Sequence, residues 1–201
     1  MDDEPACWNE TDLGVTGCER CPALVDSRSQ IVDGVGPADA DLLFVGEAPG
    51  ATEDEQGEPF VGQSGDVLDS GLRDAGLDRA DVRITNCVRC RPPENRDPTG
   101  EELTNCRGYL EREIVAVDPE LVVTLGKVPA EHLLERSVGV TGEAGDIDAV
   151  SIAGQSWRVL VCVHPAATLY DPSQRETFAA ALDRAAGYAG DGGQATFGDF
   201  S

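Results

Sequence analysis

Cysteine pairs separated by two residues occur twice in the chain, as Cys18–Cys21 and as Cys87–Cys90. Two such pairs are typical of a structural zinc site. One pair with two further cysteines also suits an iron–sulfur cluster, and Cys18, Cys21, Cys90 and Cys106 form that second set. Spacing alone slightly favours zinc, whereas the position of Cys87 near the end of a predicted strand argues against it. A metal site is therefore expected, and the choice between zinc and an iron–sulfur cluster stays open.

Four short apolar runs bring other reactive side chains to their carboxyl ends. Each run is rich in β-branched residues and short enough to be a strand, and they span 41–46, 82–88, 120–126 and 157–163. The first leads into the loop GEAPGATEDEQGEPFVGQSG, the second carries Asn86, and the fourth leads into His164. Ligands of doubly wound sheets bind beyond the carboxyl ends of the strands, so these residues are expected on one rim.

Helical patterns fall between the runs, at 64–75, 99–117, 128–135 and 173–188. Thr99 and Ser173 are expected as N-caps, because each is followed three residues later by a glutamate. Strands that alternate with helices predict an α/β fold with a parallel, doubly wound sheet. The segment 139–154 is expected to form a hairpin or loop. Residues 1–188 are expected to form a single domain, and 189–201 a disordered, glycine-rich acidic tail.

The charge of the chain is strongly negative. It holds 38 acidic and 15 basic residues, a formal net charge of -23, with carboxylates spread along its whole length. This pattern favours the surface of a halophile, where salt screens self-repulsion, although an ordinary acidic protein is the plainer alternative. It argues mildly against nucleic acid as a partner. With no long apolar stretch and no apolar signal segment, we expect a cytoplasmic protein without membrane contact.

Three separated motifs resemble the family 4 uracil-DNA glycosylases, the iron–sulfur class of thermophiles and archaea. They are GEAPGATEDEQGEPFVGQSG, TNCVRCRPPENR and HPAATL, in the family's order, and four cysteines have its spacing. The resemblance covers about residues 18–172. It implies a three-layer α/β/α fold with a central four-stranded parallel sheet. It also implies a [4Fe–4S] cluster on Cys18, Cys21, Cys90 and Cys106, without Cys87.

The resemblance implies hydrolysis of the N-glycosidic bond of deoxyuridine in DNA, which leaves an abasic site for base excision repair. Phe60 would stack on the flipped base, and its polar loop makes it a poor candidate for the core. Asn86 would accept a hydrogen bond from uracil N3–H and donate to O4, a pattern that cytosine reverses. His164 would donate to O2 as negative charge develops there, and a neutral imidazole suffices.

The carboxylates of the first motif would act on the sugar side, where an oxocarbenium-like cation is attacked by water. By resemblance Glu47 and Glu53 are the catalytic candidates, and Glu47 also binds substrate. Asp54, Glu55 and Glu58 are assigned to the acidic surface.

Further contacts with the nucleotide and the duplex follow from the same resemblance. Ala48 and Pro49 are expected to line the substrate site. Ala48 stands where family 1 enzymes carry an aspartate that handles the attacking water. Only the backbone carbonyl of Ala48 is available to contact that water. Leu169 resembles the wedge that fills the hole left by a flipped base. Tyr170 stands where many relatives carry a basic residue.

A cluster of arginines is expected to form a local basic strip that contacts phosphates within the acidic surface. Its members are Arg83, Arg89, Arg91 and Arg96, with Arg107 and Lys127 as candidate additions. Because counterion release gives little affinity in strong salt, binding should depend more on stacking and base contacts than in a mesophilic relative.

Three other functions compete with this one: an iron–sulfur redox module without catalysis, a glycosylase for a wider range of deaminated bases, and a zinc-bound nucleic-acid module. The favoured interpretation is a monomer that acts on uracil-containing DNA.

Overall fold

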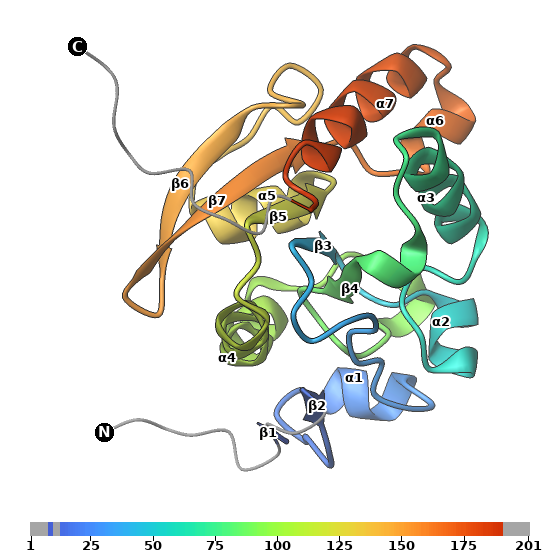
Figure 1. The fold of residues 1–201 in the computed structure, drawn as a ribbon. Helices are drawn as coiled ribbons and strands as arrows, with labels where there is room; N and C mark the ends of the chain where they lie inside the picture. The colour runs from blue at the N-terminus through green and yellow to red at the C-terminus, as the bar shows by residue number, and fades with distance from the viewer. Residues whose placement is uncertain (1–7, 10–12, 191–201) are drawn as a thin grey trace.

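A five-stranded sheet forms the centre of the molecule (Figure 1). The structure is a computed structural model that describes residues 8–9 and 13–190. The strand order is β4-β3-β5-β7-β6, with bounds Arg83–Asn86, Leu42–Gly46, Leu121–Leu125, Gln155–Cys162 and Ile147–Ile152. The first four are parallel, as predicted, and β6 pairs antiparallel with β7. The predicted count of four strands is therefore one too low, because the hairpin expected at 139–154 extends into an edge strand.

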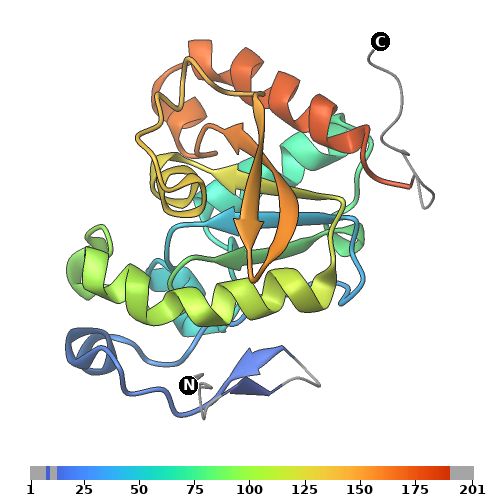
Figure 2. The ribbon, with the colours of Figure 1, turned by 90° about the vertical axis from the view of Figure 1, so that its left-hand side faces the viewer.

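Helices cover both faces of the sheet, which confirms the three layers. On one face lie α3 (Gln63–Asp74) and α7 (Ser173–Ala186), whose apolar residues join Phe44 and Val123 in one core cluster. On the other lie α4 (Gly100–Val117) and α5 (Lys127–Leu134), in a cluster with alternate residues of the same strands. Figure 2 shows the strands between α4 below and α7 above.

Of the two predicted N-caps, one is confirmed and the other is wrong. Thr99 is the N-cap of α4, and its side chain forms a capping box with Glu102. Ser173 is not an N-cap: it is the first residue of α7, and its hydroxyl donates to Asp171, so the capping prediction is wrong here.

Several short elements precede or interrupt the main pattern. They are β1 (Trp8–Asn9), β2 (Gly14–Val15), α1 (Pro22–Ser27), α2 (Ala51–Gln56) and α6 (Ala167–Tyr170), with 3₁₀ turns at Arg79–Asp81 and Pro93–Asn95. In the described part of the chain, no helix is long and apolar enough to cross a membrane. Nearly all of the predicted tail at 189–201 lies outside the described residues.

The strand ends position the site. Gly46 at the end of β3 pairs with Asn86 at the end of β4, and β7 ends two residues before His164. Gly126 follows β5 with a positive φ of 110° and lies beside His164, where a Cβ would come 3.2 Å from the histidine Cβ. The expected rim of reactive residues is therefore present.

Candidate active site

A cavity of about 170 Å³ lies beyond the carboxyl ends of β3 and β4. Residues from three segments distant in sequence line it: Glu47, Ala48, Gly50, Glu53, Phe60, Ser64, Asn86 and His164. Six of these were predicted from the sequence to bind substrate or act in catalysis. Pro49 is a predicted contact that does not line this cavity, and Gly50 and Ser64 were not predicted.

Asn86 presents an unpaired acceptor to the site. The residue is 2% exposed, and its Oδ1 is buried without a hydrogen-bond partner among the described residues. Gly46 makes the space for this amide, because a Cβ there would lie 2.4 Å from Oδ1 and 2.5 Å from the Phe60 ring. A buried acceptor without a partner costs stability, so a ligand N–H that reaches it gains a full hydrogen bond.

The Phe60 ring forms one wall of the cavity and also reaches the core. It is 6% exposed and belongs to the same cluster as Phe44 and Leu68. The prediction that Phe60 is a poor core residue is therefore wrong, because α3 folds back over the loop. Gly65 permits this approach, since a Cβ there would lie 1.9 Å from the Phe60 carbonyl oxygen. Phe60 itself has a positive φ of 54°, so its orientation is held by this packing.

His164 faces Phe60, with 6.0 Å between the ring centroids. Its Nδ1 accepts a hydrogen bond from the backbone N–H of Ala166 at 3.2 Å. That bond leaves the proton of a neutral imidazole on Nε2. Burial lowers the pKa of His164, so the neutral form is favoured. The site thus holds a neutral N–H donor.

Glu47 directly follows β3 and is partly buried. Burial raises the pKa of its carboxyl to about 7, and the nearby Asp97 carboxyl, which shares a hydrogen bond with it, acts in the same direction. Asp97 was not predicted as a functional residue. Its only signal in the sequence is its place directly after the TNCVRCRPPENR motif.

Glu53 and Asp54 stand side by side on α2 and bind different segments. Glu53 Oε1 accepts from the backbone N–H groups of Val61 and Gly62, at 3.2 and 3.0 Å, so it fixes the loop that follows Phe60. Asp54 is 2% exposed, and both its oxygens lie 2.9 Å from the N–H of Ser29. Its assignment to the surface is therefore wrong, because its turn of α2 faces the N-terminal segment. Glu55 and Glu58 are exposed as expected.

A second, smaller cavity gathers four cysteines. Cys18, Cys21, Cys90 and Cys106 line it, and all four are free thiols. Cys87 is fully buried in the core cluster between the sheet and α4 and does not line this cavity. The arrangement therefore supports the second of the two cysteine sets.

Donors surround this cysteine cavity. Arg28 Nη1 lies 2.9 Å from Cys90 Sγ, and Asn105 Nδ2 lies 3.5 Å from Cys21 Sγ. No three His, Cys, Asp or Glu side chains of the described residues converge closely enough to hold one metal ion. Thiols spaced around a cavity with donors directed at sulfur fit a multi-atom iron–sulfur cluster better than one zinc ion.

Leu169 and Tyr170 project from α6, the short helix that follows His164. They are 37% and 85% exposed and are the large hydrophobic residues found exposed in the described part of the chain. Leu169 also borders a groove of about 430 Å³ between α3 and α7, whose lining contains none of the strand-end residues. The larger hollow is therefore not the candidate active site.

Comparison with known proteins gives the family. Residues 34–186 match the Uracil DNA glycosylase superfamily. The type-4 uracil-DNA glycosylase of Archaeoglobus fulgidus is 40% identical over 168 residues, 82% of this chain and 84% of the relative. That of Pyrobaculum aerophilum is 39% identical over 82% of this chain and 85% of the relative. The chain belongs to the type-4 uracil-DNA glycosylases. A type-5 uracil-DNA glycosylase of P. aerophilum is also similar, at 32% identity over 92% of this chain and 96% of the relative.

Two members of the predicted basic strip of this uracil-DNA glycosylase lie inside the protein. Arg83 and Arg89 are 4% and 1% exposed, and each binds one oxygen of the buried Glu113 at 2.6 Å. Arg89 also binds Asp33 at 2.7 Å. These two arginines point toward α4 from the β4 edge of the sheet, where they neutralise a buried carboxylate. Their assignment to phosphate contacts is wrong.

The other basic residues of that set are mostly paired with acids. Arg96 binds both oxygens of Glu102, and Arg107 binds Glu111 at 2.7 Å. Arg91 donates to Asn95, and the exposed Lys127 lies 3.7 Å from Glu131. No continuous basic strip therefore lies beside the cavity among the described residues.

Proposed function

We propose that this chain hydrolyses the N-glycosidic bond of deoxyuridine in DNA, releasing uracil and leaving an abasic site for base excision repair. The observation that carries the proposal is the buried, unpaired Asn86 Oδ1 in a cavity between Phe60 and His164. The relatives named type-4 uracil-DNA glycosylase support the same activity.

Asn86 reads the base. Its Oδ1 accepts from uracil N3–H while its NH₂ group donates to O4. Cytosine offers an acceptor at N3 and a donor at its amino group, so it leaves the buried amide unpaired twice. A site built to bond a polar group discriminates strongly against an analogue that reverses it.

His164 and Phe60 act on the departing uracil. The Nε2–H of His164 donates to O2, where negative charge accumulates as the C1′–N1 bond breaks. The Phe60 ring stacks on the face of the base and holds it in line with this donor. A neutral imidazole is a suitable donor because it needs no proton transfer.

Glu47 acts on the sugar. In its ionised form it stabilises the cationic sugar and accepts the proton of the attacking water as the C1′–O bond forms. The backbone of Ala48, which lines the cavity, borders the path of that water. Glu53 keeps the Phe60 loop in place through Val61 and Gly62, and its proximity to the cavity supports a second, electrostatic contribution to the sugar.

The DNA is held mainly by uncharged contacts. Leu169 enters the space that the flipped nucleotide leaves, which is a known use of apolar side chains. Few basic residues near the cavity are free of acidic partners in the described part of the chain, and the net charge is -23. Both observations support DNA binding that depends only weakly on phosphate contacts, and activity in strong salt. We place the enzyme in the cytoplasm as a monomer, with residues 1–188 as one catalytic domain.

Four cysteines, Cys18, Cys21, Cys90 and Cys106, would hold a [4Fe–4S] cluster. When bound, the cluster supplies a covalent tie between the N-terminal segment and the loop beyond Asn86. The hydrolysis moves no electron, so we assign it no step in the reaction.

The test is base removal from a labelled oligonucleotide that carries one uracil opposite guanine, in high salt, with abasic sites read by alkaline cleavage. Wild-type protein should cleave the uracil strand and leave a thymine strand intact. Asn86→Ala should lose activity by ~10²-fold or more, the cost of removing one well-placed polar group. Asn95→Ala, in an exposed turn, is the matched control. An intact uracil strand with folded wild-type protein would refute the proposed activity.

A further inference from the structure

Arg28 connects two of the four cysteines that line the second cavity. It follows α1, and its Nη1 donates to Cys90 Sγ at 2.9 Å while its Nη2 donates to the carbonyl oxygen of Cys18 at 2.7 Å. Cys18 precedes α1 and Cys90 follows β4, so one planar guanidinium joins two segments that are remote in sequence. In the described residues its hydrogen bonds reach a sulfur and a carbonyl, and none reaches a carboxylate.

The backbone beside Arg28 is anchored independently. The N–H of Ser29 lies 2.9 Å from both oxygens of the buried Asp54, and Gln30 Nε2 donates to the Asp54 carbonyl at 2.9 Å. These bonds tie the residues after Arg28 to α2. The guanidinium is therefore held in position from both ends of its side chain, which favours a fixed contact with sulfur over a transient one.

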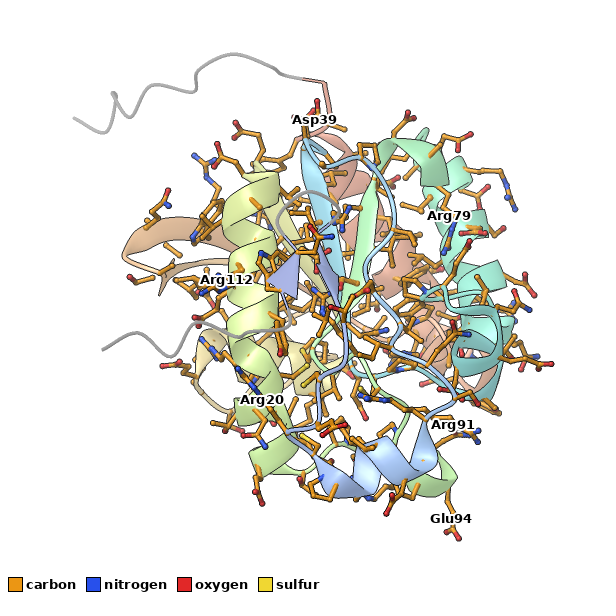
Figure 3. All side chains as sticks on the ribbon, turned by 90° about the horizontal axis from the view of Figure 1, so that it is seen from below. Arg20, Asp39, Arg79, Arg91, Glu94 and Arg112 are labelled. Carbon is orange, nitrogen blue, oxygen red and sulfur yellow. The ribbon has the colours of Figure 1, made fainter. Side chains whose placement is uncertain are left out.

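Arg20 differs from Arg28 in the groups that it contacts. It lines the same cavity, but its Nη1 donates to the Asn105 carbonyl at 3.1 Å and its guanidinium lies over the Tyr109 ring, 5.1 Å from the centroid. Figure 3 shows Arg20 beside α4. Two arginines with the same charge thus border one cavity, and Arg28 is the one bonded to a cysteine sulfur.

We propose that Arg28 raises the reduction potential of the cluster by donating a charge-assisted hydrogen bond to its Cys90 ligand. The inference rests on the proposed cluster. One-electron reduction adds negative charge to the cluster and its thiolates, and a cationic donor on sulfur stabilises the reduced form more than the oxidised form. Donors around metal ligands are a general means of setting potential.

The test measures the midpoint potential of the purified holoprotein by spectroelectrochemistry, together with iron content. Arg28→Gln removes the charge and should shift the reduction equilibrium at least tenfold toward the oxidised form, a fall of about 59 mV for one electron. Arg20→Gln makes the same change of charge in the same cavity without a sulfur contact, and should shift the potential much less. Equal shifts in the two variants, or no shift in Arg28→Gln, would overturn the proposal.

Arg28→Lys serves if Arg28→Gln loses its iron. Lysine keeps the charge but lacks the planar fork, so the potential of this variant should fall below that of the wild type by less than about 59 mV, and an unchanged potential would contradict the role of the sulfur bond. Wild-type protein that contains no iron would refute the cluster itself and the Arg28 proposal with it. Uracil release, measured on the same sample, would still report the proposed function separately.

Discussion

Replacing Asp97 by asparagine should extend activity to lower pH. The mechanism requires Glu47 in its ionised form, and burial together with the Asp97 carboxyl raises the Glu47 pKa to about 7. Below that pH Glu47 is protonated and the rate falls. The amide of the Asp97→Asn variant carries no charge, so the Glu47 pKa should fall, although burial, the larger cause, keeps it above its ordinary value.

The size of the effect follows from the titration. With a pKa of about 7, roughly half of Glu47 is ionised at pH 7 and about one tenth at pH 6. If Asp97→Asn brings the pKa below 6, more than about half is ionised at pH 6. The variant should then retain at least about five times more of its own high-pH rate at pH 6 than the wild type does.

The assay is single-turnover uracil release from pH 5 to 9 at constant ionic strength. Asp97→Glu keeps the carboxylate, so the acid limb of its pH–rate profile should stay near its wild-type position. Glu94→Gln removes one charge from the same loop, and Figure 3 shows Glu94 pointing away from the body of the molecule, so this control should leave the limb unmoved. His164 is neutral through most of this range because burial lowers its pKa. An acid limb that stays in place in Asp97→Asn would refute the assignment of Glu47.

Three further outcomes are expected. Glu113→Gln leaves Arg83 and Arg89 without their shared buried carboxylate, so chemical unfolding should show a loss of about 3–5 kcal/mol, whereas the exposed Glu55→Gln should show almost none. His164→Ala should lower the single-turnover rate by ~10²-fold or more at every pH, and a loss confined to one limb of the profile would argue against a neutral donor. Tyr170 is 85% exposed beside Leu169, and we expect its ring to stack on the DNA. Tyr170→Ala should therefore raise KM for duplex DNA several-fold with kcat nearly unchanged, and Tyr170→Phe should behave as wild type. The salt dependence of binding should stay shallow in both variants, since stacking involves no counterion release.

Much of the fold was predictable because its signals are local. Four β-branched runs with helical patterns between them are sufficient for the parallel sheet, and the Thr99 capping box marks the start of α4. The edge strand β6 was harder to predict, because it pairs with its neighbour through a hairpin and has only one buried residue, Ile152. Its sequence, IDAVSI, is short and directly follows the acidic, glycine-containing residues GEAGD, so no local signal separates it from a loop.

In the candidate site, too, residues with a local sequence signal were predictable and residues that depend on distant partners were not. The positions of Asn86 and His164 were predictable because they lie at or just beyond the carboxyl ends of strands, where the fold places ligands. The burial of Arg83, Arg89 and Asp54 was not, since each depends on a partner far along the chain. An arginine opposite a buried carboxylate has the same local sequence signal as one that contacts a phosphate. The role of Asp97 was unpredictable for the same reason: only the folded chain brings it to Glu47.

The most direct test of the central claim is an experimental structure of the protein with free uracil. We predict that uracil occupies the 170 Å³ cavity, with N3–H and O4 bonded to Asn86, the Phe60 ring stacked on its face, and His164 Nε2 within hydrogen-bond distance of O2. Uracil bound in the larger groove between α3 and α7, or in this cavity without contact to Asn86, would contradict the claim.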